Sequence, residues 1–221
     1  MKVAVYKNAL PVEVYKTAIE TFKTHIAVPG VVGKSLDKAK LDDARKADVR
    51  YLRPERKDTA LMNKVSVIRH HVDNEGSSST VNDYASSVGM YNWLIDFMSE
   101  NKYGNNLEPE VVQVITYKEG NYYDWHRDGS GTGYRKFSFI SILSPKDQYE
   151  GGELEIDGIE LPEYAYDPLS VIIFNPSLRH RVKPVTKGIR HSLVTWFKDK
   201  DFPRELMQSN LPKGGNKKYY D

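Results

Sequence analysis

The stretch that decides the fold is residues 171–197, VIIFNPSLRHRVKPVTKGIRHSLVTWF. It begins with a continuous apolar run, Val171–Phe174, which is typical of a strand buried on both sides, and Asn175-Pro176 ends that run. A short segment broken by a proline, 182–185, comes next, and an alternating segment, 189–197, completes the stretch. Short strands separated by Gly and Pro are typical of a β-sandwich or β-barrel.

The same pattern extends upstream. Further strand-like segments, rich in β-branched residues or alternating in polarity, end at turn signals such as Glu119-Gly120-Asn121 and Ser144-Pro145. These segments are 111–117, 122–128, 137–143 and 152–156. Many short strands at regular spacing predict an α+β protein whose core is a double-stranded β-helix, also called a jelly roll.

Two histidines and one aspartate within these strands predict a metal site. In a strand, residues i and i+2 point to the same face, so His126 and Asp128 converge while Arg127 points away. His180 follows far enough downstream for the sheet to fold back towards them. Two imidazoles and one carboxylate leave positions open on the metal, which suits non-haem Fe(II) with O2 and a chelating co-substrate.

Each part of this pattern has a simpler interpretation when it is taken alone. An isolated His-x-Asp triplet is common and usually makes a surface hydrogen bond. His180 alone could be a loop histidine, and Arg190 alone could form a surface ion pair. Strand alternation, however, puts Arg190 and Ser192 on one face and His191 on the other. A guanidinium beside a hydroxyl suits a carboxylate, so the prediction depends on all of these residues occurring together.

The residues that carry a family resemblance are Tyr117, His126-Arg127-Asp128, the run YEGGEL at 149–154 and the run HRVKPVTKGIRHS at 180–192. With them, the stretch from about Val111 to Phe197 resembles the catalytic core of Fe(II)/2-oxoglutarate-dependent dioxygenases. Within that superfamily it is most similar to the prolyl 4-hydroxylase-like group, which includes the PKHD-type hydroxylases.

The resemblance implies a role for each residue. His126, Asp128 and His180 would be the catalytic iron ligands, and Arg190 would pair with the distal carboxylate of 2-oxoglutarate. Ser192 would assist Arg190, and Tyr117 would hydrogen-bond the co-substrate or simply pack in the core. The implied cofactors are Fe(II), 2-oxoglutarate and O2, with ascorbate as a further candidate. Some relatives place a second tyrosine where this chain has Ile142, so either the co-substrate pocket is less polar there or a different hydroxyl, such as that of Ser138 or Ser141, substitutes for it.

The resemblance also implies a hydroxylase that converts 2-oxoglutarate to succinate and CO2 and acts on a C–H bond, foremost on proline in a peptide or protein. Three alternatives stay open: a free amino acid, a nucleic-acid substrate, and a jelly-roll module that binds metal without turnover. No second arginine follows Arg190 before Phe197, which argues against nucleobases. The candidate specificity loops are 74–80, 129–135 and 157–167, and several tyrosines could line a peptide groove: Tyr122, Tyr123, Tyr134, Tyr149, Tyr164 and Tyr166.

The chain is expected to be a single domain, 1–221, in which a mainly helical region, 1–105, supports an oxygenase core, 106–200. The last residues, 201–221, are expected to be a partly flexible extension. One amphipathic helix is predicted over 11–25, with these residues near one face: Val14, Ala18, Phe22 and Ile26. Another helix is predicted from Thr80 or Asn82 to about Glu100, with a buried stripe made of Tyr84, Val88, Tyr91, Leu94, Ile95 and Met98.

Other segments are less informative. Residues 37–47 are highly charged and predict a solvated helix or loop, and 65–68 are a candidate strand. The adjacent His70-His71 and also His191 are interpreted as structural, and Trp125 as a core residue facing away from His126.

Composition is consistent with an enzyme of this kind. The formal net charge is +2, so no strongly charged partner is implied, and the basic aromatic tail is expected to be a frayed end rather than a nucleic-acid site. The chain has no cysteine, which excludes disulfides and Cys-based metal sites. With no long apolar run or signal-like start, the expected location is cytoplasmic, away from membranes. The expected partner is a peptide, protein or small-molecule substrate, and the sequence leaves the oligomeric state open.

Overall fold

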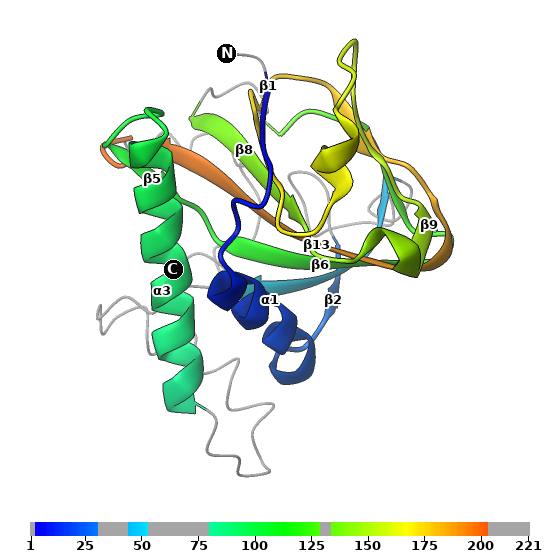
Figure 1. Ribbon diagram of the computed structural model, residues 1–221, viewed down its shortest axis with the longest axis horizontal. Helices are drawn as coiled ribbons and strands as arrows, with labels where there is room; N and C mark the ends of the chain where they lie inside the picture. The colour runs from blue at the N-terminus through cyan, green and yellow to red at the C-terminus, as the bar shows by residue number, and fades with distance from the viewer. Residues whose placement is uncertain (1–2, 31–43, 53–79, 129–133, 203–221) are drawn as a thin grey trace, which may run out of the picture.

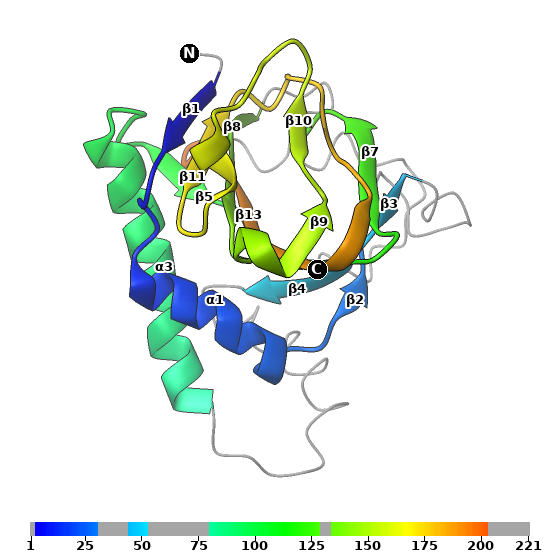
Figure 2. The same cartoon turned by 45° about the vertical axis from the view of Figure 1, so that its right-hand side comes forward.

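The computed structural model describes residues 3–30, 44–52, 80–128 and 134–202. In this part of the chain, two antiparallel sheets face each other and two helices, α1 (Val12–Thr24) and α3 (Thr80–Glu100), lie against the outside of the larger sheet (Figures 1 and 2). The arrangement is an α+β double-stranded β-helix, as the strand pattern predicts. None of the helices in the described residues is long and apolar enough to cross a membrane.

The larger sheet has the order β1-β11-β8-β13-β6-β4-β2, and the smaller sheet has the order β10-β12-β7-β3. The strands of the larger sheet are β1 (Val3–Tyr6), β11 (Val171–Phe174), β8 (Arg135–Ile142), β13 (Val185–Asp199), β6 (Val112–Lys118), β4 (Asp48–Leu52) and β2 (Val28–Pro29), with β5 (Leu107–Pro109) and β9 (Tyr149–Gly151) pairing β13 at its two ends. Those of the smaller sheet are β10 (Leu154–Ile156), β12 (His180–Val182), β7 (Tyr122–His126) and β3 (Arg45–Lys46). Two short 3-10 helices, η1 (Lys146–Gln148) and η2 (Glu163–Tyr166), lie in connections.

Strand alternation divides the apolar residues of the larger sheet between two cores. On β8, Phe139 belongs to the core beneath the helices, whereas Ile140 belongs to the core between the sheets. The same division holds on β13, where Leu193 faces the helices and Val194 faces the barrel interior. The larger sheet is therefore covered on both faces, and its inner face forms one wall of the barrel.

The two helices support the larger sheet much as their apolar spacing predicts. Val14 and Ala18 of α1 are buried, and so are Tyr91, Leu94 and Met98 of α3. The prediction that Ile26 belongs to the apolar face of α1 is wrong, because Ile26 lies beyond the last residue of the helix and is 60% exposed. The helix ends earlier because the backbone is extended at His25.

The N-terminal region also supplies strands that the sequence pattern did not reveal. β1 pairs with β11, β4 pairs with β6, and β3 pairs with β7. These strands have two to five residues, too few for alternation to be recognisable. The predicted solvated segment 37–47 is wrong at its described end, where both Arg45 and Ala47 are buried.

Strand boundaries in the core differ in detail from the prediction. β9 was not predicted, and β13 runs unbroken from Val185 because Pro184 lies before the strand rather than inside it. Outside the described residues lie the candidate strand 65–68, His70-His71, the loop 74–79 and residues 203–221. α3 begins at Thr80, where its start was predicted.

Candidate metal centre

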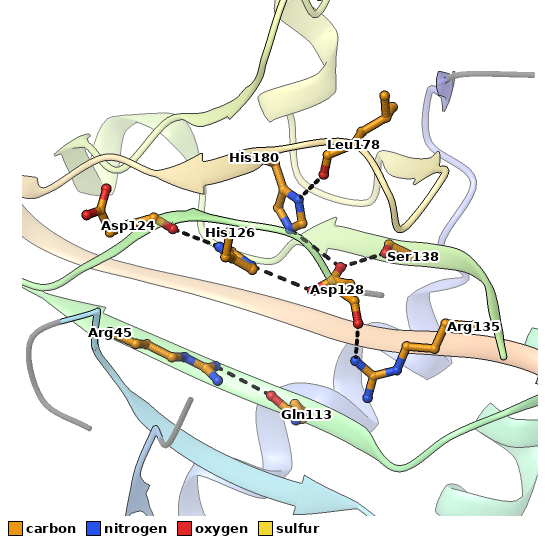
Figure 3. A network of polar contacts seen from close by, with 9 residues as sticks. All are labelled: Arg45, Gln113, Asp124, His126, Asp128, Arg135, Ser138, Leu178 and His180. Atoms are coloured by element: carbon orange, nitrogen blue, oxygen red, sulfur yellow. Dashed lines mark hydrogen bonds and ion pairs between the residues drawn. The ribbon is translucent and has the colours of Figure 1, made fainter. Parts of the chain in front are cut away.

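Three side chains of the kinds that could hold a metal ion meet inside the barrel. His126 ends β7, His180 begins β12, and the two are register partners across the smaller sheet. Asp128 follows two residues after His126, so strand geometry returns its side chain to the same side. One ligand atom from each residue lies within 4.8 Å of the others, and Figure 3 shows the three side chains pointing towards one another.

The distances leave room for one ion among these atoms. His126 Nε2 lies 3.6 Å from Asp128 Oδ1, and His180 Nε2 lies 3.4 Å from Asp128 Oδ2. These separations are longer than direct hydrogen bonds, as expected for atoms that share a metal of about 2.0–2.2 Å ligand distance.

Backbone carbonyls fix which nitrogen each histidine presents. His126 Nδ1 donates to the carbonyl of Asp124 at 2.8 Å, and His180 Nδ1 donates to the carbonyl of Leu178 at 3.0 Å (Figure 3). A carbonyl can only accept, so the proton of each neutral ring is on Nδ1. Both Nε2 lone pairs therefore face Asp128, which is the tautomer that a metal requires.

Electrostatics favour the ionised form of Asp128 and the neutral form of His180. Burial alone would raise the pKa of Asp128, but the close imidazoles of His126 and His180 and the hydrogen bond from Ser138 lower it well below its usual range. Burial lowers the pKa of His180, which keeps that ring neutral. A carboxylate and a neutral imidazole are the forms that coordinate metals.

Asp128 is held by further contacts. Ser138 on β8 donates from Oγ to Asp128 Oδ2 at 2.6 Å, and Arg135 Nη1 donates to the Asp128 carbonyl at 3.0 Å. The guanidinium of Arg135 in turn forms a bidentate ion pair with Glu110. Of the two serines considered as replacements for a co-substrate tyrosine, Ser138 donates to Asp128 and Ser141 donates to the Ser170 carbonyl.

Arg190, Ser192 and Tyr117 form a second cluster on the inner face of the larger sheet. All three are at most 1% exposed. Arg190 Nη1 lies 3.3 Å from Ser192 Oγ, and its guanidinium carbon lies 5.4 Å from the centre of the Tyr117 ring. Arg190 Nε has no hydrogen-bond partner, and no carboxylate of the described residues lies within 4.0 Å of this guanidinium. The buried cation is thus set up to receive an anion.

A glycine makes room for this guanidinium. Gly152 has a φ of +68°, and a Cβ built there would lie 2.8 Å from Arg190 Cδ. Any larger residue would be strained and would displace the arginine. The role of the Tyr149–Leu154 run in the cluster is thus to leave room for Arg190 at Gly152, and it supplies no functional group there.

Two other aromatic predictions have different outcomes. His191 faces away from the cluster and stacks on Phe22 of α1 with ring centres 4.1 Å apart, so its structural interpretation agrees with its position. Trp125 faces away from His126 but is not a core residue. Its ring is partly exposed beneath the guanidinium groups of Arg179 and Arg181.

Sequence reasoning missed two arginines and a tryptophan around the triad, and it predicted Tyr123 only as a possible lining of a peptide groove. The ring of Tyr123 stacks on His126 with centres 3.5 Å apart and an angle of 11°. The guanidinium of Arg45 lies over Tyr123, and that of Arg135 lies over Trp196. Arg45 comes from a two-residue strand, which is too short for any local pattern to have indicated it. Trp196 could have been found, because it shares a face of β13 with Arg190 and Ser192.

Comparisons with known proteins agree with this geometry. Residues 112–198 match the family model described as the 2OG-Fe(II) oxygenase superfamily. A PKHD-type hydroxylase of Synechococcus sp. (strain CC9605) is 39% identical over 82 residues, which are 35% of this chain and 37% of that protein. A PKHD-type hydroxylase of Idiomarina loihiensis is 34% identical over 110 residues, which are 47% of this chain and 50% of that protein. The chain thus covers half or less of the length of these relatives.

Solved structures share the fold. A prolyl hydroxylase from Trichoplax adhaerens, in complex with a peptide fragment of the hypoxia inducible factor oxygen degradation domain, has a TM-score of 0.63 at 13% identity and covers 94% of this chain and 87% of its own. A prolyl-4-hydroxylase of Pseudomonas putida has a TM-score of 0.53 at 17% identity, covering 90% of this chain and 92% of its own. These likenesses extend the jelly-roll match well beyond residues 112–198.

Proposed function

We propose that this chain, whose residues 112–198 match the family model of the 2OG-Fe(II) oxygenase superfamily, is an Fe(II)- and 2-oxoglutarate-dependent hydroxylase. The observation that carries the proposal is the convergence of two Nε2 lone pairs and one ionised carboxylate within 4.8 Å. The side chains of His126, Asp128 and His180 would be the protein ligands, because two imidazoles and one carboxylate on one face suit Fe(II) and leave positions for other ligands.

The second cluster supports the choice of co-substrate. 2-Oxoglutarate carries two carboxylates, one of which belongs to the metal-chelating end. The buried Arg190 would receive the other in a charge-assisted pair, with the Ser192 hydroxyl and the Tyr117 ring beside it. A buried guanidinium without an acidic partner is otherwise unfavourable, so the residues present fit the group.

When bound, the iron and the co-substrate would supply oxidative chemistry with O2, giving succinate and CO2 and hydroxylating a substrate C–H bond. The chain's own residues position and shield that chemistry. Hydrogen bonds from Ser138 and Arg135 hold Asp128, the carbonyls of Asp124 and Leu178 orient the imidazoles, and Tyr123 covers one face of His126. Burial within the barrel keeps bulk water away.

The substrate class that we propose is a peptide or protein, with proline as the foremost target residue. It is supported by the names of the relatives and by the prolyl hydroxylase folds, one of which holds a peptide fragment. Ascorbate, as an additional ligand, remains a prediction from the sequence resemblance alone.

The test is 2-oxoglutarate-dependent succinate release under air with Fe(II), measured with and without a panel of proline-containing peptides. Wild type should release succinate slowly alone and faster with a matching peptide, and Asp128→Ala should release none. If only free amino acids stimulate succinate release, the substrate is a free amino acid rather than a peptide. If folded wild-type protein releases no succinate, the result favours a module that binds metal without turnover.

A further inference from the structure

A second buried guanidinium lies near the metal centre. Arg45 belongs to β3 and is the register partner of Tyr123 on β7, so its side chain shares the inner face of the smaller sheet with that ring. Only 6% of Arg45 is exposed. The next residue, Lys46, lies over Tyr122 on the outside of the barrel. A cation from an edge strand thus enters the interior rather than remaining in solvent.

Arg45 has no carboxylate partner within 4.0 Å among the residues that the structure describes. Its contacts there are a long hydrogen bond of 3.4 Å from Nη2 to Gln113 Oε1 and the Tyr123 ring, whose centre lies 4.9 Å from its guanidinium carbon. Its Nε has no hydrogen-bond partner in the described ranges. Arg135, which also lies beside the triad, is by contrast fully paired with Glu110 at 2.7 and 2.8 Å. Within the described part of the chain, Arg135 is thus neutralised by Glu110, whereas Arg45 contacts only neutral groups.

The position of Arg45 separates it from the co-substrate cluster. Gln113 and Tyr117 lie on the same face of β6, four residues apart, which is about 13 Å along a strand. Tyr117 pairs with Arg190, whereas Gln113 pairs with Val194. Figure 3 shows Arg45 and Gln113 below the triad, with the guanidinium directed at the amide. Arg45 also contacts Tyr123, which stacks on the ligand His126.

The fold makes room for this arginine at a glycine. Gly30 is buried next to β2 and donates its N–H to the Ala47 carbonyl at 2.8 Å. A Cβ built at Gly30 would lie 2.8 Å from Arg45 Nε. Gly30 thus packs against Arg45 Nε, and the terminal nitrogens of Arg45 point towards Gln113. The same device appears at Gly152, which packs against Arg190.

We propose that Arg45 and Gln113 form a carboxylate-binding subsite for the substrate, distinct from the Arg190 cluster. A guanidinium presents two parallel N–H donors that match a carboxylate, and the Gln113 amide adds a third donor. The carboxylate would lie one aromatic ring away from the metal ligand His126, so the substrate would carry its acid close to the reacting carbon. The substrate role rests on the proposed function, but carboxylate binding itself requires neither iron nor turnover.

The first experiment measures the thermal unfolding midpoint of the metal-free protein in sodium acetate and in equal concentrations of acetamide, with ionic strength matched by NaCl. Acetate should raise the midpoint of wild type above its value in acetamide. Arg45→Met should lose a measurable part of this acetate-specific shift, and Arg45→Lys should keep some of it. The acetate-specific shift that is lost in Arg190→Met measures how much of the wild-type shift comes from acetate binding at the Arg190 cluster.

Three results would overturn the subsite: no acetate-specific shift in wild type, an undiminished shift in Arg45→Met, or an Arg45→Met protein that does not fold. The last would show that Arg45 maintains the fold, whereas an unpaired buried cation kept for a ligand can be replaced by Met without loss of stability. Gly30→Ala should reduce the acetate shift as Arg45→Met does. Loss of succinate release with an intact acetate response would contradict the proposed function alone.

A second pair of probes separates the two sources of a carboxylate. Glycine carries it on a free amino acid, and N-acetylglycine carries it as the end of a peptide chain. Stabilisation through Arg45 by glycine alone assigns a free amino acid, and stabilisation by N-acetylglycine assigns a peptide. If neither stabilises the protein while acetate does, the site holds an adventitious anion only and the substrate assignment is wrong.

Discussion

At the scale of single residues, the proposed metal centre depends on hydrogen bonds that set the direction of each candidate ligand. The two Nδ1 donors make each histidine present Nε2, and Ser138 holds one oxygen of Asp128. Arg190 is held by Ser192 and by the space at Gly152. Each of these contacts can be removed separately, so each role can be tested separately.

Replacing Ser138 with alanine is expected to weaken Fe(II) binding by about 10- to 100-fold, the usual effect of removing a group that orients a metal ligand. The fold should persist, because the one hydrogen bond that this hydroxyl makes to the described residues is the bond to Asp128. Isothermal titration with Fe(II) under nitrogen measures the change. Ser141→Ala is the matched control, since this serine on the same strand bonds the Ser170 carbonyl on the other face. Equal Fe(II) affinity in both variants would contradict the role of Ser138.

Arg190→Ala is expected to raise the concentration of 2-oxoglutarate needed for succinate release. Removing a charge-assisted pair of roughly 1.5–3 kcal/mol corresponds to about a 10- to 150-fold change. Arg190→Lys should restore part of the loss, because it keeps the charge but not the fork of donors. Fe(II) affinity should stay close to wild type in both variants. An unchanged 2-oxoglutarate dependence in Arg190→Ala would remove this arginine from the co-substrate site.

At the scale of elements, β13 lies between the cluster of Arg190, Ser192 and Tyr117 on its inner face and the helices on its outer face. Arg190 and Ser192 point inwards, while His191 points to α1 and contacts Phe22 and Thr116. Burial and the nearby guanidinium groups of Arg50 and Arg190 lower the pKa of His191 to about 4 from an ordinary value of 6.5. The helix therefore packs against a histidine that must remain neutral.

This pKa shift predicts a loss of stability in acid. Between pH 6.5 and about 4 the unfolded chain binds a proton at His191 that the folded chain does not, so the free energy of unfolding falls as pH falls through this range. Because the ring is partly exposed, its share is reduced to about 1–2 kcal/mol. Urea unfolding at pH 7 and pH 4 should show a smaller decrease for His191→Gln than for wild type. Identical decreases would contradict the assignment.

The elements also show what could be predicted from the sequence. The strands that carry His126, Asp128, His180 and Arg190 were found, because alternation and turn signals are local properties of the chain. β1, β3 and β4 were not, because strands of two to five residues are defined by their distant partners rather than by their own pattern. The roles of Arg45 and Ser138 are equally invisible locally, since both depend on contacts across the two sheets.

At the scale of the whole molecule, a barrel wall is stabilised by helices on its outer face while its inner face holds the site. α3 lies against the larger sheet, and its residues Leu94 and Met98 are fully buried in the outer core (Figure 1). The inner core is separate and contains Tyr117 and Phe174, which adjoin the site. The residues that stabilise the fold beneath the helices and the residues of the site thus lie on opposite faces of the larger sheet.

This division predicts that Leu94→Ala lowers stability without changing metal binding. Truncating a fully buried leucine typically lowers the free energy of unfolding by about 2–5 kcal/mol. Urea unfolding followed by tryptophan fluorescence measures the loss, and Fe(II) affinity at low temperature should stay within about twofold of wild type. Asp96→Ala, at an exposed position of the same helix, should leave both quantities unchanged. A large change in Fe(II) affinity in Leu94→Ala would mean that the two faces are coupled.

The most direct test of the central claim is an anaerobic titration of the purified protein with Fe(II) and 2-oxoglutarate, monitored for a weak visible charge-transfer band. Wild type should develop the band only when both are present. Asp128→Ala should show none, and Arg190→Ala should require more 2-oxoglutarate to reach the same intensity. A band that persists in Asp128→Ala, or no band in folded wild-type protein, would contradict an iron and 2-oxoglutarate site built on His126, Asp128 and His180.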